Sequence, residues 1–139
     1  MRIQAIEKFV RGQKVALIGS VDEDGVPNIK AMLSPRQQIG LKEFYFSTNL
    51  SAIRTQQFIK NPKACVYFFN KGLIKYTGVM LRGKMEVIKD QEIKNLIWRN
   101  GDTKFYRQGV TDPDYVVLKF TATSGRFYQD LHSEELKLD

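Results

Sequence analysis

The chain has 139 residues, of which 42% are hydrophobic and 27% charged, and this composition predicts one globular domain over residues 1–139. No apolar run is long enough to cross a bilayer, no apolar signal core stands at the N-terminus, and the single cysteine excludes an internal disulfide, so we expect a cytoplasmic protein without a membrane partner. The formal net charge is +7, but the lysines and arginines are scattered and no zinc-finger or RNA-recognition motif is present, so we expect no nucleic-acid partner.

The first part of the chain has the pattern of a helix followed by a hairpin. Residues 2–11 carry apolar side chains at helical spacing, and Gly12 is a typical helix stop. Residues 15–21 form a short apolar run of strand length, which Asp24-Gly25 follows as a strong turn signal. Residues 26–34 then alternate between apolar and polar side chains. The sequence therefore predicts a hairpin whose second strand has one apolar and one mixed face.

A strand, a short helix and a second apolar strand are predicted next. Residues 44–47 are aromatic and strand-like. A helix is expected from about Ser51, and it should end before Pro62 because the residue that precedes a proline avoids helical geometry. Residues 64–69 are apolar throughout, which predicts a strand that is buried on both faces.

The last part of the chain contains two more strands around a helix. Residues 76–88 alternate clearly, Asp90 is a plausible N-cap for a helix closed by Asn100-Gly101, and residues 116–122 alternate again. About six strands in mostly hairpin order, with a few short helices, predict a mainly β protein. The expected architecture is a closed or partly closed antiparallel barrel.

The types of residue that are scarce limit the chemistry. The one histidine, His132, excludes a multi-histidine metal site, and the lone Cys65 excludes a thiolate zinc cage and is expected to be an inert core residue. No pair of carboxylates stands in an acid–base arrangement, so no catalytic side chain is identified and no metal is expected. If the protein is an enzyme, a cofactor is expected to supply the reactivity.

The segment from residue 47 to residue 54 carries the positive signal. It runs from a strand into a helix and offers hydroxyl groups and a cation, namely Ser47, Thr48, Ser51 and Arg54. Backbone N–H groups at a helix start, with hydroxyls and a guanidinium beside them, form an anion site. These residues alone favour a different interpretation over the anion site, in which Asn49 or Ser51 caps the helix and Arg54 faces water. Lys30, on the neighbouring strand, favours the anion site because it offers a second cation.

Several of these segments together resemble a known family. Residues 26–32, residues 44–49, Arg54 and Asn61-Pro62 resemble, in order and spacing, the pyridoxamine-phosphate-oxidase-like FMN-binding split barrels. Residues 78–83, 112–115 and 125–128 are similar to the bacterial general-stress-protein branch of that family, and the resemblance covers about residues 5–130. It implies a six-stranded antiparallel split β-barrel with short helices.

The resemblance also implies a cofactor and its ligands. In such proteins the FMN phosphate is held by a cation on the second strand, by Ser or Thr at the end of the next strand, and by a cation in the following helix. The positions that correspond to the flavin site here are Lys30, Ala31, Met32, Ser47, Thr48, Asn49, Ser51, Arg54 and Tyr128. Ala52 stands where many relatives carry serine, so the resemblance implies one phosphate hydrogen bond fewer, unless Ser51 replaces it. Gly78 stands where the true oxidase has a flavin-contacting glutamine, and the C-terminal substrate-binding Trp and Arg pattern of that oxidase is not evident, so oxidation of vitamin B6 itself is not implied.

The expected function is that of an FMN-dependent oxidoreductase that passes electrons from a nicotinamide or another donor to a small-molecule acceptor. The resemblance implies a homodimer with the flavin at its interface. Three alternatives stay open: a non-catalytic flavin-binding or flavin-storage protein, the same barrel with deazaflavin or haem, and a nucleic-acid-binding barrel. His132 is the one histidine that a haem could use, and the nucleic-acid alternative rests on charge alone.

Overall fold

The structure, a computed structural model, describes residues 2–72 and 75–138 and contains eight strands in one sheet. The strands are β1 Val15–Val21, β2 Pro27–Leu33, β3 Gln37–Ile39, β4 Glu43–Asn49, β5 Lys63–Asn70, β6 Thr77–Ile88, β7 Tyr115–Gln129 and β8 His132–Lys137. The six predicted strands are confirmed. The short β3 and the polar β8 were not predicted, and His132 is the exposed first residue of β8.

The helices lie around this sheet. They are α1 Arg2–Arg11, α2 Ile53–Lys60 and α3 Gln91–Ile97, followed by the 3₁₀ turns η1 Asp102–Lys104 and η2 Gly109–Thr111. The predicted cap of α3 is confirmed, since the Asp90 carboxylate accepts hydrogen bonds from the backbone N–H groups of Glu92 and Ile93. The helix ends earlier than expected, because Trp98 adopts extended backbone angles. None of the described helices has the length and apolar character that crossing a membrane requires.

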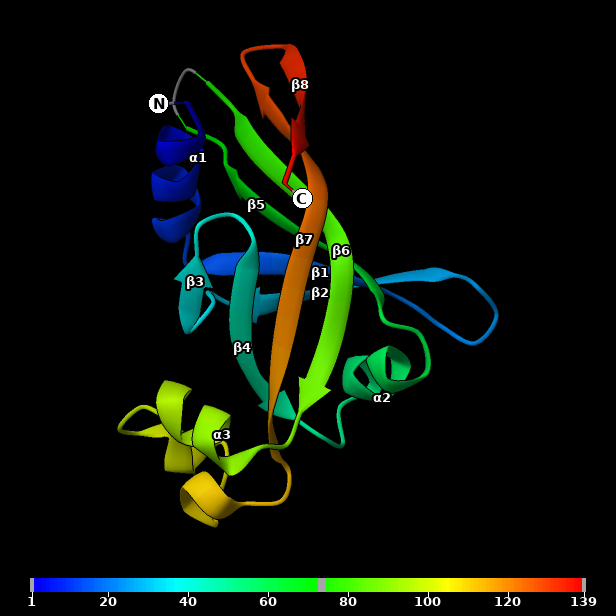
Figure 1. Cartoon of the computed structure of the whole chain (residues 1–139), viewed down its shortest axis with the longest axis vertical. Helices are drawn as coiled ribbons and strands as arrows, with labels where there is room; N and C mark the ends of the chain where they lie inside the picture. Colours follow the sequence, from blue (N-terminus) through cyan, green and yellow to red (C-terminus); the bar gives the residue numbers. More distant parts are fainter. Residues whose placement is uncertain (1, 73–74, 139) are drawn as a thin grey trace.

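The sheet curls into a split barrel. Its strand order is β2-β1-β5-β6-β7-β4-β3, with every pair antiparallel, and β8 pairs with the second half of β7. In Figure 1, β4, β6 and β7 run along the long axis while β1 and β2 lie across them. The backbone N–H of Arg36 donates to the Tyr45 carbonyl over 2.7 Å, which brings the end of β2 next to β4. This closure places the two strand ends that carry the predicted site side by side.

Two clusters of buried side chains form the interior. The main cluster fills the barrel and includes Ile6 and Val10 of α1. A smaller one joins Ile97, Tyr106, Tyr115 and Val117, with the partly buried Ile93 of α3 packed against it. The start of β7 is therefore buried on both faces, whereas the sequence predicted one buried face.

Two strand faces differ from expectation. The apolar face of β2 is not buried within the single chain, since Ile29 is 71% and Leu33 66% exposed. On β5, Phe69 is exposed and Cys65 is half-buried, because only one face of this strand packs into the barrel core. The prediction of a strand buried on both faces was therefore wrong for β5. At β2, an unpaired edge strand with exposed apolar side chains is the kind of surface that another chain covers.

A close approach of β6 to β7 accompanies a bulge. The register between the two strands shifts between Arg82 and Gly83, where β7 has one extra residue. A Cβ atom on Gly83 would stand 1.9 Å from the Thr121 carbonyl oxygen. Only glycine lets the two backbones come so close at this position.

Candidate functional site

Two neighbouring cavities open between β2, the end of β4 and the start of α2. The first, which we call the β4 cavity, measures about 170 Å³ and is lined by Ala31, Met32, Leu33, Ser34, Arg36, Ser47, Thr48, Asn49, Arg54, Phe105 and Tyr106. The second, the β2–α2 cavity, measures about 320 Å³ and is lined by Ser20, Asn28, Ile29, Lys30, Ala52, Ile53, Arg54 and Gln57. Arg54 lines both cavities. The structure thus brings together seven of the nine residues that were predicted for the site.

The local structure explains how Arg54 reaches this position. Along β4 the side chains alternate, so that Phe44, Phe46 and Thr48 face inward. Arg54 stands in the first turn of α2, and its Nη2 donates to the Thr48 Oγ1 over 2.9 Å. Because Thr48 accepts this bond, its own hydroxyl hydrogen stays available for a ligand.

The Arg54 guanidinium is only partly satisfied. Its Nε atom is buried and has no hydrogen-bond partner among the described residues. Burial lowers the pKa of this guanidinium below its ordinary value, since the charged form loses hydration. A buried cation with an unused donor is stabilised by an anion that supplies both an opposite charge and an acceptor. The site therefore fits a phosphate group.

Lys30 supplies the second cation from β2. Its side chain is exposed, and it lines the β2–α2 cavity together with Arg54. Lys30 forms no ion pair within residues 2–72 and 75–138. Arg54 and Lys30 thus flank one opening with two positive charges, of which neither is neutralised by a described carboxylate.

Asn49 and Ser51 are held by a carboxylate. The Asp114 side chain accepts from Asn49 Nδ2 over 2.9 Å, from the Ser51 backbone N–H over 2.8 Å and from the Ser51 hydroxyl over 3.0 Å. Burial opposes ionisation of Asp114, but these hydrogen bonds prevail and lower its pKa. Neither residue caps α2, whose N-cap position is Ala52 without a side-chain bond. Asn49 still lines the β4 cavity, whereas Ser51 lines neither cavity and fixes the turn.

Tyr128 lies elsewhere. It stands opposite Gly78 on β6, and its ring lies 5.9 Å from that of Tyr76. It lines neither of the two cavities. Phe127, its neighbour, is buried near α1, under the guanidinium of Arg2. Within one chain, Tyr128 is therefore not part of the site that surrounds Arg54.

Five residues that line the β4 cavity were not among the predicted site residues, namely Leu33, Ser34, Arg36, Phe105 and Tyr106. Arg36 follows β2, and Phe105 and Tyr106 follow η1. The Arg36 guanidinium binds the Asp102 carboxylate through two hydrogen bonds of 2.8 and 2.9 Å, and this pairing raises the pKa of Arg36. An adjacent pair of aromatic residues in a loop was the one available signal for this wall.

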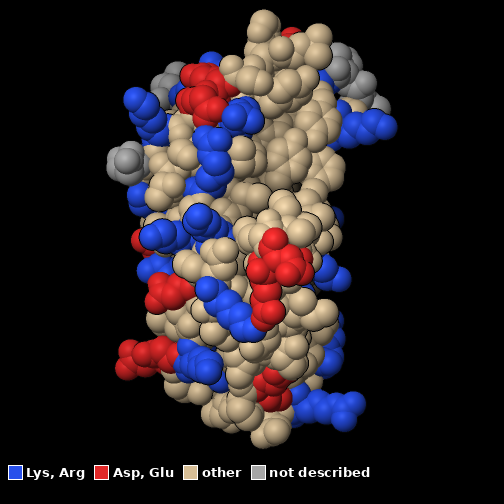
Figure 2. All heavy atoms as spheres, turned by 90° about the vertical axis from the view of Figure 1, so that its right-hand side faces the viewer, with Lys and Arg blue, Asp and Glu red and all other residues tan. Residues whose placement is uncertain are grey.

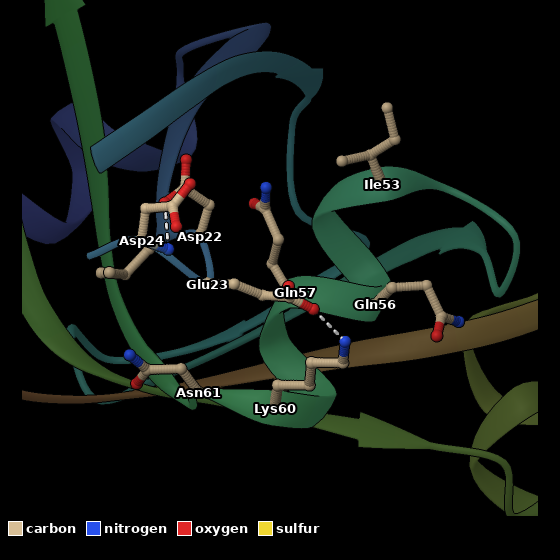
Figure 3. Close-up of a pocket in the computed structure, with 9 residues that line it drawn as sticks. Asp22, Glu23, Asp24, Ile53, Gln56, Gln57, Lys60 and Asn61 are labelled. Carbon is tan, nitrogen blue, oxygen red and sulfur yellow. Dashed lines mark hydrogen bonds and ion pairs between the residues drawn. The ribbon is translucent and has the colours of Figure 1, made fainter. Parts of the chain in front are cut away.

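A larger hollow of about 360 Å³ lies farther along α2 (Figure 3). The turn residues Asp22 and Asp24 face Gln57 and Lys60 of α2 across it, and Lys60 pairs with Glu23. Because that ion pair is exposed and its charges neutralise each other, this hollow has no unpaired cation to attract an anion. Size alone therefore does not make it the site. Within the described residues, no group of three or more His, Cys, Asp or Glu side chains is arranged to hold a metal ion.

Comparison with known proteins places the chain in one family. Residues 3–129 match the family described as pyridoxamine 5'-phosphate oxidase. A Clostridium acetobutylicum protein related to general stress protein 26 of B. subtilis, of the pyridoxinephosphate oxidase family, is 36% identical, with a TM-score of 0.86 over 99% of this chain and 94% of that one. General stress protein 26 of Bacillus anthracis is 19% identical, with a TM-score of 0.78 over 99% and 98% of the two chains, and at this identity the likeness concerns the fold.

Two further proteins that the chain resembles carry more specific names. The pyridoxine/pyridoxamine 5'-phosphate oxidase of Agrobacterium fabrum is 32% identical over 75 residues, which are 54% of this chain and 34% of the oxidase. The match thus spans about a third of the length of that curated relative. A heme binding protein from Mycobacterium smegmatis shares the fold at 11% identity, with a TM-score of 0.77 over 99% of this chain and 58% of that one. On the family match over residues 3–129 and the 36% identical relative, the chain belongs to the pyridoxamine 5'-phosphate oxidase family, beside its general-stress-protein 26 members.

Proposed function

We propose that this protein binds FMN and that Arg54, Thr48, Ser47 and Lys30 hold the phosphate of the cofactor. The buried Arg54 Nε atom, which has no partner among the described residues, is the observation that supports this most. A phosphate monoester supplies the acceptor and the negative charge that this guanidinium lacks. The family supports the choice of ligand, since the residues that resemble its phosphate site are those that line the two cavities.

The side chains present bind and orient the cofactor. The flavin ring supplies the redox chemistry when it is bound, because none of the described cavity residues forms an acid–base pair of its own. Ala31 and Met32 of β2 line the same cavity as Arg54, so the strand offers a backbone edge along the proposed flavin position. Asn49 and Ser51 keep the turn before α2 in place through Asp114. With this division of roles, the function we propose is that of an FMN-dependent oxidoreductase, with a small-molecule acceptor and a nicotinamide donor as the proposed partners.

A second copy of the chain is the proposed cover of the site. β2 ends the sheet, and its exposed Ile29 and Leu33 line the two cavities. A homodimer that covers β2 removes this apolar surface from water and encloses the flavin. Tyr128, which lies apart from the cavities of its own chain, reaches a flavin in this arrangement only from the partner subunit.

Oxidation of vitamin B6 is not the proposed reaction. A Cβ atom on Gly78 would stand 2.3 Å from the Tyr67 hydroxyl oxygen, so Tyr67 occupies the space that a side chain at position 78 needs. The Tyr67 hydroxyl also pairs with that of Tyr76, over 2.6 Å. The aromatic side chains therefore replace the polar contact that the family's oxidases make there.

Haem is less suited to this site than a flavin. The one histidine of the chain, His132, is exposed at the start of β8 and lines neither cavity, so it offers no axial ligand beside Arg54.

Lysine and arginine side chains are interspersed with aspartate and glutamate on the face that Figure 2 shows, so this face carries no continuous basic tract for a nucleic acid.

The proposal is tested on the purified protein. The absorbance spectrum is expected to have flavin bands, and titration is expected to give tighter binding of FMN than of riboflavin. A Soret band would indicate that the protein binds haem and not a flavin. Equal affinity for FMN and riboflavin would contradict the proposed phosphate site. Anaerobic mixing with NADH or NADPH distinguishes an oxidoreductase from a storage protein. The bound flavin is expected to be reduced in an oxidoreductase, and it would stay oxidised in a storage protein.

The dimer is tested by sedimentation. The wild-type protein is expected to sediment as a dimer at micromolar concentration, and Ile29→Asp is expected to shift it to the monomer. Leu96→Asp is the matched control, because Leu96 is also exposed, at 63%, but belongs to α3. A wild-type monomer that retains FMN would contradict the proposed interface.

A further inference from the structure

Tyr106 is an aromatic residue that is fixed in place and still faces the β4 cavity. Its side chain is only 4% exposed, yet it lines the cavity together with Ser47, Thr48 and Arg54. Its ring lies 4.7 Å from that of Tyr115 and 6.0 Å from that of Trp98. Packing thus leaves this side chain little freedom before any ligand binds.

A buried ion pair holds the backbone segment that carries Tyr106. Arg36 and Asp102 have side-chain exposures of 9% and 6%, and two hydrogen bonds join them. Arg36 also donates to the Ile97 carbonyl over 3.1 Å, and the Arg99 backbone N–H donates to Asp102 over 2.9 Å. The backbone N–H of Tyr106 bonds to the Asp102 carbonyl over 3.0 Å. The position of Tyr106 therefore depends on a pair of charges that sits beside the cavity.

The Tyr106 hydroxyl is a neutral donor close to the cation. Burial raises its pKa above the ordinary value and outweighs the opposing influence of the Ser47 side chain. The phenol thus keeps its proton throughout the neutral range. Ser47 and Tyr106 line the same cavity as Arg54, so an anion held by Arg54 would lie in the cavity that both of these side chains line.

We propose that Tyr106 is a phosphate-binding residue of this site and that Arg36 and Asp102 position it. The inference rests on the proposed FMN function and extends the phosphate site to the segment after η1. Its ligand class is a phosphate monoester, to which the phenol donates a charge-assisted hydrogen bond while Arg54 supplies the charge. The site is then built from three parts of the chain: β2, the β4–α2 turn and the segment after η1.

Titration of Tyr106→Phe with FMN and with riboflavin tests the phosphate contact. The substitution keeps the ring that packs on Tyr115 and removes only the hydroxyl. FMN affinity is expected to fall about tenfold while riboflavin affinity stays unchanged. Tyr45→Phe is the control, because the Tyr45 hydroxyl bonds to Glu43 and does not line the cavity. Control and wild type should bind FMN alike.

The outcomes separate this inference from the proposed function. A wild-type protein that binds no FMN refutes both. If the wild type binds FMN and Tyr106→Phe binds it equally well, only the inference fails. Equal loss of FMN and riboflavin affinity would mean that Tyr106 shapes the cavity and does not contact phosphate, which also overturns the inference.

The positioning role is tested by a double-mutant cycle. Asp102→Asn is expected to reduce the ratio of FMN to riboflavin affinity, and adding Asp102→Asn to Tyr106→Phe should reduce it no further. This ratio is measured at a temperature where all variants are folded, so a loss of stability alone does not change it. Additive losses in the double variant would contradict the positioning role.

Discussion

Arg54 donates from Nη2 to the Thr48 hydroxyl oxygen over 2.9 Å, while its Nε atom is buried without a partner among the described residues. The first contact fixes the guanidinium against the end of β4. The buried Nε–H group has no acceptor among the described residues, so a bound ligand would have to supply one. Burial of a donor without a partner costs on the order of 1–3 kcal/mol, and a bound anion recovers this cost. The apo protein therefore carries a local cost that ligand binding relieves.

Thr48→Val is expected to weaken FMN binding about fivefold, less than the loss of a charged group, because it removes one neutral hydroxyl worth about 1 kcal/mol. The shape of the side chain is nearly kept, so the loss reports the hydrogen bond. Isothermal titration of the variant with FMN measures it. Thr123→Val is the control, since Thr123 lies on an exposed part of β7, away from the cavities. A loss as large as that of an Arg54 variant would mean that Thr48 is needed for folding of the site.

Asp102→Asn is expected to lower the free energy of unfolding by about 3 kcal/mol near pH 7, because it leaves the buried Arg36 charge without its partner. Asp24→Asn, an exposed carboxylate on the β1–β2 turn, is the matched control and should change it little. Urea unfolding of both variants provides the comparison. Equal stability of Asp102→Asn and wild type would contradict the role of this pair.

The same pair predicts part of the acid sensitivity. Burial would raise the pKa of Asp102, but hydrogen bonds from Arg36 and the Arg99 backbone outweigh it and lower the pKa below the ordinary 3.8. A carboxyl with a depressed folded-state pKa stabilises the fold fully above its unfolded-state pKa, and this contribution is lost as the pH falls through the folded-state value. Wild-type stability is therefore expected to fall below about pH 4 more steeply than that of Asp102→Asn. Parallel acid limbs in the two proteins would contradict this.

Gly83→Ala is expected to destabilise the fold by at least about 2 kcal/mol, because the added methyl group meets the Thr121 backbone, which cannot rotate away. Gly12→Ala is the control, since a Cβ atom there would lie 3.5 Å from the nearest atom, the Phe9 carbonyl oxygen. That substitution is expected to be neutral or to stabilise by about 0.5 kcal/mol through the unfolded chain. Thermal melts measure the stability of both variants. A loss in Gly83→Ala alone supports the clash with the Thr121 backbone, whereas an equal loss in Gly12→Ala would contradict it.

The fold could be predicted largely from local patterns. Alternation located the strands that face the core, and Asp90 marked the start of α3. β3 and β8 were missed because their sequences, Gln-Gln-Ile and His-Ser-Glu-Glu-Leu-Lys, contain little apolar alternation. These two strands form because β4 and β7 offer backbone partners, which is a property of the assembled sheet.

The site was predictable where the chain itself brings groups together. Ser47, Thr48 and Arg54 lie within one strand–turn–helix segment, so their proximity followed from the sequence. Tyr106 could not be found in this way, because it reaches the cavity through the ion pair of Asp102 with Arg36, 66 positions away in the chain. Ser51 was assigned to the ligand, but the carboxylate of Asp114, distant in sequence, binds it instead. Contacts between distant segments thus decided the parts that the sequence left open.

Titration of Arg54→Ala with FMN and with riboflavin tests the central claim most directly. Since only FMN carries the phosphate, and a charge-assisted hydrogen bond is worth roughly 1.5–3 kcal/mol, FMN affinity is expected to fall about ten- to a hundredfold while riboflavin affinity changes little. A melting curve of the apo variant is expected to match the wild type closely, because the guanidinium is only partly satisfied without a ligand. Equal loss of FMN and riboflavin binding, or failure of the apo variant to fold, would mean that Arg54 is structural and that the phosphate site lies elsewhere.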